Sequence, residues 1–90
     1  MQIIIVGCGN VGTTLTEQLS KEGHNITVVD MDAKKAESVA NRFDVMGIVG
    51  NGASFTVQNE AGIEAADLMI AVTTSDELNL LCCLIARKAG

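Results

Sequence analysis

Ninety residues, 48% of them hydrophobic and 2% aromatic, suffice for one small domain with an aliphatic core. The formal net charge of −5 and the lack of a Lys/Arg cluster argue against binding to nucleic acid or to anionic lipid. No apolar run approaches the roughly 20 residues that cross a bilayer, and the first residues lack the basic region of a signal peptide. Cys8, Cys82 and Cys83 have no metal-site spacing, so we expect reduced thiols in a cytosolic protein without direct membrane insertion.

The chain begins with a predicted strand over residues 2–6, an unbroken apolar run typical of a strand buried on both faces. A glycine turn, Gly7-Cys8-Gly9-Asn10-Val11-Gly12, joins it to a predicted helix. Gly7 permits the tight turn, Gly9 lets the backbone approach a phosphate, and Gly12 lets the helix pack close to the strand. The first amides of such a helix lack intrahelical partners and lie at the positive end of its dipole. The junction therefore predicts a pyrophosphate site.

The first helix is predicted from Val11 to about Glu22, with Val11, Leu15 and Leu19 on one inward stripe. Gly23 ends it, and a short His24-Asn25 loop follows. A second strand, 26–30, ends in a carboxylate. Asp30 lies 18 residues after Gly12, close to the spacing of about 20 residues expected for the acid that binds ribose hydroxyls. The alternative is that Asp30 merely starts a turn or caps the next helix.

Asp32 is the better candidate for that cap. Together the two carboxylates, Asp30 and Asp32, would repel a 2′-phosphate, which favours NAD or an adenosine phosphate over NADP. The second helix is predicted over 33–42, with Ala36, Val39, Ala40 and Phe43 inward, as the apolar spacing indicates.

A third strand over 45–49 is weakened by Gly47. The polar loop over 50–54 then lies on the rim of the first glycine turn, where Asn51 is a candidate partner for adenine; the alternative is a plain turn. A short helix is predicted from Ser54 or Thr56 through Ala61, with Gly62 after it.

The fourth strand is predicted over 67–72, followed by a loop, 73–76, and a last helix, 77–88, that Ser75 or Asp76 caps. Its apolar surface is too wide for one contact face, which indicates a partner on more than one side. The widened stripe contains Leu78, Leu80, Leu81, Cys82, Cys83, Leu84 and Ile85.

The alternation of four strands and four helices of about 10 residues predicts an α/β, Rossmann-like doubly wound parallel sheet with strand order 3-2-1-4. In this order the glycine turn faces the loop after the fourth strand across the switch point. Thr73 is therefore a candidate phosphate or ribose contact, and Asp76 is first a cap.

The whole chain resembles the N-terminal nucleotide-binding domain of TrkA-type potassium-uptake proteins, also called KTN or RCK-N. The segments that carry the resemblance occur in the family's order: IIIVGCGNVG, VVDMD, GNGAS and AVTTSDELN. The resemblance implies a cytosolic, non-enzymatic sensor at the inner face of the cell membrane. Such a sensor binds NAD(H) or ATP/ADP, forms dimers or larger rings, and gates a membrane-embedded potassium transporter.

The resemblance also implies site residues. The diphosphate side comprises Gly7, Gly9, Asn10, Val11 and Gly12, with Thr73 near the phosphates. Asp30, with Met31 beside it, would contact the ribose, and Asn51 and Gly52 the adenine side. Family members that favour ATP often carry a basic residue where this chain has Asn10, so the resemblance favours NAD or NADH, with ATP/ADP as the alternative.

Two other readings are a cofactor-binding fragment of an NAD-dependent dehydrogenase and the cytosolic domain of a proton-coupled potassium antiporter. The chain has one histidine, His24, expected at the rim opposite the glycines, and no tyrosine, so no catalytic constellation is evident. Met1 directly before the first strand argues against preceding membrane helices. Family members continue beyond the fourth helix, so we expect residues 1–90 to be a fragment with a truncated sheet. Its fourth strand would be an edge and, with the apolar last helix, would promote self-association.

Overall fold

The computed structural model describes residues 1–73 and residue 79. Within them a parallel sheet of four strands has the order β3-β2-β1-β4, as the sequence predicts. The strands are β1 (Gln2–Val6), β2 (Asn25–Asp30), β3 (Met46–Val49) and β4 (Leu68–Ala71), and the helices are α1 (Asn10–Lys21), α2 (Ala33–Phe43), α3 (Phe55–Glu60) and a 3-10 turn, η1 (Ile63–Ala65). Of the predicted last helix, 77–88, residue 79 alone is among the described residues.

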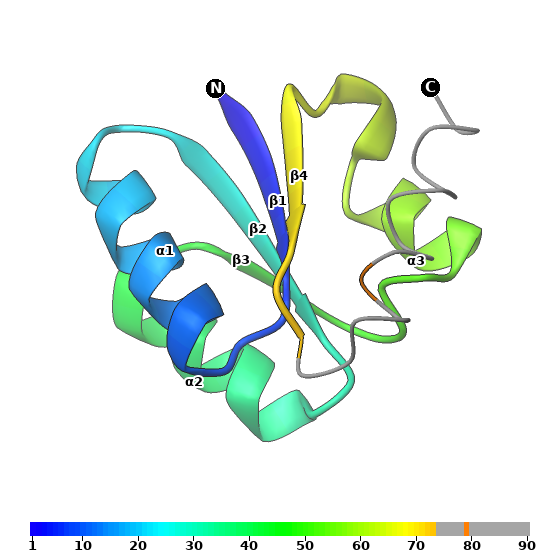
Figure 1. Ribbon diagram of the computed structural model, residues 1–90, viewed down its shortest axis with the longest axis horizontal. Helices are drawn as coiled ribbons and strands as arrows, with labels where there is room; N and C mark the ends of the chain where they lie inside the picture. Colours follow the sequence, from blue (N-terminus) through cyan, green and yellow to red (C-terminus); the bar gives the residue numbers. More distant parts are fainter. Residues whose placement is uncertain (74–78, 80–90) are drawn as a thin grey trace.

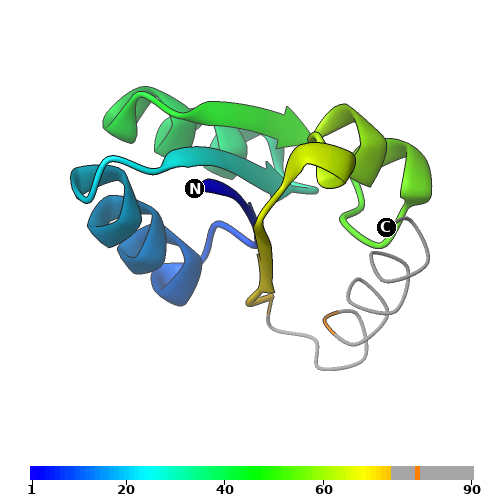
Figure 2. The ribbon, with the colours of Figure 1, turned by 90° about the horizontal axis from the view of Figure 1, so that it is seen from above.

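The sheet separates two layers of helices. Helices α1 and α2 cover one face, and α3 with η1 covers the other (Figures 1 and 2). Strand β1 lies at the centre and pairs with β2 and β4. Its four residues from Ile3 to Val6 are all buried, because alternate side chains enter the two separate cores. The continuous apolar run therefore forms a strand that is buried on both faces, as the sequence predicts.

The buried face of α1 differs from the predicted stripe. Leu15 and Leu19 pack partly against the core, but Val11 is 60% exposed. Gly12 and Thr16 are the buried residues of this helix instead. Because Gly12 has no Cβ, the helix approaches the strand closely there and rotates its buried face toward residue 16. The Thr16 hydroxyl is satisfied within the helix, since it donates to the Gly12 carbonyl at 2.8 Å.

The other boundaries follow the predicted signals with small shifts. Asp32 caps α2, Ser54 rather than Thr56 caps α3, and Gly23 and Gly62 adopt positive φ after helical turns. Helix α3 has 6 residues, within the short span predicted from Ser54 or Thr56 through Ala61. The 3-10 turn η1, which follows Gly62, has no counterpart among the predicted elements. Strand β3 is mostly exposed at the sheet edge.

Gly47 has a packing role rather than only weakening β3. A Cβ at this position would lie 2.9 Å from the Ala40 Cβ and 3.1 Å from the Ala36 carbonyl oxygen. Helix α2 therefore packs directly on the β3 backbone, with two alanines facing one glycine. The predicted inward positions Ala36 and Val39 are buried, and Ala40 and Phe43 are partly buried.

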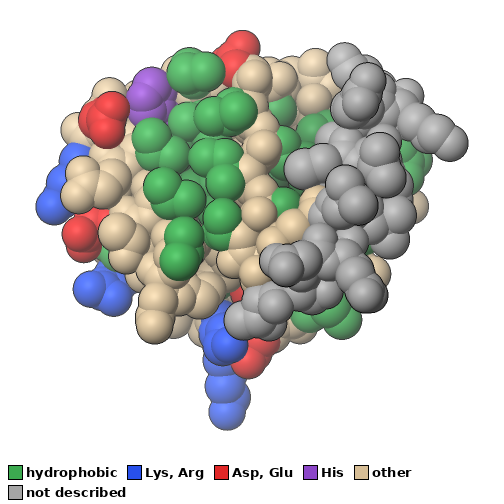
Figure 3. All heavy atoms as spheres, in the orientation of Figure 1, with side chains coloured by type: hydrophobic (Ala, Val, Ile, Leu, Met, Phe, Trp, Pro, Cys, Tyr) green, Lys and Arg blue, Asp and Glu red, His purple; other side chains and the backbone are tan. Residues whose placement is uncertain are grey.

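An apolar area remains between α1 and β4 on the face that Figure 3 shows. Leu15, Leu19 and Ile70 are only partly buried there, and Leu68 is 42% exposed. Strand β4 is the outer strand of the described sheet, as the sequence predicts. No helix within residues 1–73 combines the length and apolar character needed to cross a bilayer.

Candidate functional site

The carboxyl ends of the four strands meet at one rim, because all strand pairs are parallel. A cleft of about 130 Å³ opens at this rim, at the switch point between β1 and β4. Five predicted site residues line it together: Gly7, Asp30, Met31, Gly52 and Thr73. Val6, Val29 and Gly50 complete the lining. The topology thus brings together residues from four separate loops.

The three glycines of the turn differ in their surroundings. Gly7 has φ 114°, and a Cβ there would lie 2.9 Å from the Val72 carbonyl oxygen. A Cβ on Gly12 would lie only 1.8 Å from the Gly7 carbonyl oxygen, so α1 starts in direct contact with the turn. A Cβ on Gly9, in contrast, would meet no atom of the described residues within 4 Å. Gly9 therefore faces open space, with Asn10 and Val11 exposed beside it.

Helix α1 begins at Gly9 without a side-chain cap from any described residue. Helices α2 and α3 differ, because the Asp32 and Ser54 side chains accept hydrogen bonds from their first amides. The 12-residue α1 thus presents the positive end of its dipole and its first amides at the rim beside Gly9. This arrangement suits an anion such as a phosphate.

Asp30 connects the glycine turn to the start of α2. One carboxylate oxygen accepts the Cys8 amide at 2.8 Å, and the other accepts the Asp32 amide at 2.8 Å. Asp32 in turn accepts the Lys34 amide at 2.9 Å to cap α2. Asp30 therefore starts a turn, as the alternative interpretation predicts. Each carboxylate oxygen also has a second lone pair, so the group retains capacity for a sugar hydroxyl.

The loop after β3 is held by its own side chains. Asn51 is exposed, and its side-chain oxygen accepts the Ala53 amide at 2.9 Å. Gly52 is buried, and a Cβ there would lie 2.4 Å from a Val6 methyl group. Gln58, which the sequence reading did not single out, donates to the Gly52 carbonyl at 2.8 Å. The backbone of Gly52 therefore forms part of the cleft wall, whereas Asn51 does not line the cleft.

Thr73 reaches the cleft from the end of β4 and is connected to Asn79. Its amide donates to the Asn79 side-chain oxygen at 3.0 Å, and the Asn79 amide group donates to the Thr73 carbonyl at 3.2 Å. The Thr73 hydroxyl also donates to the Asn79 oxygen. Asn79 thus fixes the backbone of Thr73, a role that only the fold reveals. The predicted capping residues Ser75 and Asp76 lie outside the described residues.

Cys8 lies at the centre of the turn, with its amide on Asp30 and its thiol in the core beside Ile3 and Ile5. Burial, and after it the nearby Asp30 carboxylate, raise the pKa of the Cys8 thiol to about 11, while Lys35 opposes the rise. The thiol therefore stays neutral at physiological pH. The protonated Cys8 thiol contributes fully to the free energy of unfolding below the ordinary pKa of 9.0, and this contribution is lost as the pH rises through about 11.

We expect Cys8 to resist alkylation in the folded protein. At pH 8 its raised pKa leaves roughly 100-fold less thiolate than an unperturbed thiol would have, and burial restricts access further. Iodoacetamide labelling followed by peptide mapping measures Cys8 separately from Cys82 and Cys83. The unfolded protein in guanidinium chloride provides the reference rate. Equal Cys8 labelling in the folded and unfolded protein would contradict this expectation.

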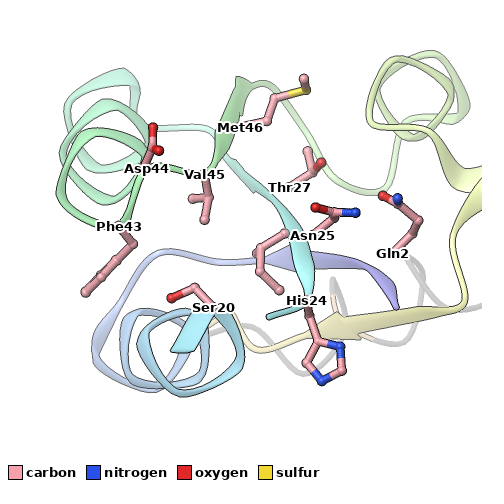
Figure 4. A pocket seen from close by; sticks show the side chains of 10 residues that line it. Gln2, Ser20, His24, Asn25, Thr27, Phe43, Asp44, Val45 and Met46 are labelled. Atoms are coloured by element: carbon pink, nitrogen blue, oxygen red, sulfur yellow. The ribbon is translucent and has the colours of Figure 1, made fainter. Parts of the chain in front are cut away.

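A larger hollow, about 450 Å³, lies at the opposite rim. Figure 4 shows side chains from the strand starts, including Gln2, Asn25 and Met46, together with Ser20 and Phe43 near the helix ends. The carboxyl ends of α1 and α2 approach this hollow, and helix carboxyl ends disfavour anions. His24 lines this hollow, which confirms its predicted place away from the glycines. The smaller cleft is therefore the candidate nucleotide site.

Comparison with known sequences identifies a family. A family model described as the TrkA-N domain matches residues 3–90. The Trk system potassium uptake protein TrkA of Halomonas elongata is 45% identical over 86 residues, which are 96% of this chain and 19% of that protein. The chain spans about a fifth of the length of the first such relatives that it matches.

Comparison with solved structures supports the fold. The TrkA-N domain of the inner membrane protein ybaL from Escherichia coli superposes with a TM-score of 0.89 at 23% identity, covering 97% of this chain and 64% of that one. The AMP-bound Kef CTD of Shewanella denitrificans gives a TM-score of 0.84 at 20% identity, covering 98% and 52%. At these identities the likeness concerns the Rossmann-like fold.

Proposed function

Because the chain belongs to the TrkA-N domain family, we propose that it is an NAD(H)-binding regulatory domain, whose ligand changes its conformation and thereby gates a membrane potassium transporter. The observation that carries this proposal is that Gly7 and Asp30 line one cleft, while the open position Gly9 lies in the same turn as Gly7. The turn suits a diphosphate, and the acid suits a ribose. Binding rather than catalysis is the proposed role.

The diphosphate would lie at the start of α1. Gly9 leaves room for it, and the first amides of the helix, at Asn10 and Val11, supply donors at the positive end of the dipole. Gly7 and Gly12 support this surface from behind, since each has the close contacts described above. Thr73 would approach the phosphates from the facing strand, with Asn79 holding its backbone.

The adenosine part would follow the other wall of the cleft. Asp30 would accept the ribose hydroxyls while retaining its amide partners, and Met31, 65% exposed, would lie beside the sugar. Gly52 would border the adenine from the cleft wall, and the exposed Asn51, outside the lining, would approach the adenine from the rim. Asp30 ends β2 and Asp32 caps α2, and these two carboxylates would repel a 2′-phosphate on a ribose bound by Asp30. We therefore propose NAD or NADH as the ligand rather than NADP.

ATP or ADP is the alternative ligand, and the Kef CTD, a domain of similar fold solved in AMP-bound form, supports it. The contacts proposed for the adenosine and first phosphate are the same in both cases. A cofactor-binding fragment of a dehydrogenase is a weaker alternative, because the relatives with high identity are named as potassium uptake proteins.

The partner that we propose is a membrane-embedded potassium transporter subunit, on which this domain assembles as a dimer or larger oligomer at the cytoplasmic side. The names of the relatives support the potassium system. The apolar area between α1 and β4 and the outer position of β4 supply surface for assembly.

Calorimetric titration with NADH, NAD⁺, NADP, ATP and AMP tests the ligand. We expect NADH or NAD⁺ to bind, AMP to bind more weakly because it lacks the second phosphate, and NADP to bind at least about tenfold more weakly than NAD⁺. Stronger binding of ATP than of NADH would establish the alternative. Binding of none of these nucleotides would refute the proposed function.

A further inference from the structure

Gln58 is an unusual buried side chain in this small domain. It is 1% exposed and lies on α3, where an apolar residue would fill the same space. Thr16 is also buried, but its hydroxyl is satisfied inside its own helix. The Gln58 amide instead reaches out of α3 and donates to the Gly52 carbonyl at 2.8 Å. Burial of an amide is costly unless the amide is hydrogen-bonded, so this contact outside the helix indicates a specific structural role for Gln58.

That contact fixes one peptide group in the wall of the cleft. The carbonyl of the Gly52–Ala53 peptide accepts from Gln58, and the amide of the same peptide donates to the Asn51 side chain at 2.9 Å. Both polar groups of this peptide are therefore held by side chains, and its plane cannot turn without losing a hydrogen bond. The close approach of Gly52 to Val6 holds the loop from another direction.

We propose that Gln58 is a positioning residue for the nucleotide site: it fixes the Gly52 peptide and so sets the affinity for the adenine side of the ligand. This inference rests on the proposed nucleotide binding. An apolar side chain could fill the volume of Gln58 but would leave the Gly52 carbonyl without its donor. The peptide would then turn, and the cleft wall beside Asp30 would change shape.

Two variants separate the hydrogen bond from the packing. Gln58→Met keeps the length but removes the donor, and we expect about tenfold weaker binding of AMP and NADH with little change for inorganic diphosphate. Gln58→Glu keeps the shape and donates only when the introduced carboxyl is protonated. Burial beside a carbonyl favours the protonated form at low pH. We therefore expect near-normal AMP affinity at pH 5.5 and about tenfold weaker binding at pH 8, relative to the unsubstituted protein at each pH.

Thr16→Val is the matched control, because Thr16 is the other buried polar side chain in the part of the chain that the structure describes, and it does not line the cleft. It should leave AMP affinity unchanged even if the melting temperature falls. Normal AMP affinity of Gln58→Met, and of Gln58→Glu at both pH values, would overturn the positioning role while leaving nucleotide binding intact. Equal losses for AMP and inorganic diphosphate would also overturn it. If the unsubstituted protein binds no adenine nucleotide, the proposed function fails and this inference fails with it.

Discussion

Replacing Gly12 with alanine is expected to destabilise the domain by at least about 3 kcal/mol, which corresponds to a fall of roughly 12–24 °C in melting temperature. The added Cβ would lie 1.8 Å from the Gly7 carbonyl oxygen, so either α1 or the turn must move. The intrinsic preference of alanine for helices offsets only about 1 kcal/mol. Because the moving parts form the proposed diphosphate site, NADH binding should be lost as well. Thermal melting and calorimetry measure the two effects.

Gly9→Ala is the matched control from the same turn. Its φ of −78° suits alanine, and its Cβ would meet no described atom within 4 Å. We expect a stability change below about 1 kcal/mol but at least about tenfold weaker NADH binding, because the methyl group would occupy the phosphate approach. A stable Gly12→Ala variant would contradict the packing argument. Unchanged NADH affinity of Gly9→Ala would contradict the placement of the diphosphate.

Asp30→Ala should lower both stability and nucleotide affinity. Two amides, those of Cys8 and Asp32, lose their acceptor, at a cost of about 2 kcal/mol after allowance for partial exposure. Any ligand with a ribose should lose about 1–3 kcal/mol of binding free energy, or roughly 5- to 150-fold in affinity. Chemical denaturation and calorimetry with NADH measure these two quantities separately.

Asp32→Ala is the control for Asp30→Ala, because it removes the same charge two residues away. It should lose about 1 kcal/mol of stability through the missing cap of α2 and retain the affinity for NADH. If Asp30→Ala lowers stability but binds NADH normally, Asp30 is only a structural link between the turn and α2. If both variants weaken binding equally, the effect is one of general charge rather than of a specific contact.

The sequence predicts the architecture well because its signals are local and agree with one another. The apolar run before Gly7, the cap at Asp32 and the alternation of strands and helices each indicate one arrangement, and parallel strands then require that Gly7, Asp30 and Thr73 meet at one rim. The topology alone therefore predicts that these three residues lie close together.

Other features depend on how closely backbones approach, which residue patterns do not encode. Periodicity placed Val11 inside, but the contact at Gly12 rotates α1 and leaves Val11 exposed. Gly47 reads as a weak strand residue, yet it is where α2 rests on the sheet. Nothing in the sequence pattern singles out Gln58 in its short helix. Its burial becomes evident only when the loop at Gly52 is folded against β1.

The uncapped start of α1 has a consequence for the proposed nucleotide binding. Asp32 and Ser54 complete the first turns of α2 and α3, whereas α1 begins at Gly9 with no such help from the described residues. A bound diphosphate would supply the hydrogen-bond acceptor that the first amides of α1 lack. The order of this first turn would therefore increase with the concentration of free nucleotide. Each tenfold rise above the dissociation constant adds about 1.4 kcal/mol to stability by mass action. If the domain regulates a transporter as proposed, ordering of the first turn of α1 would be the local change that follows nucleotide binding.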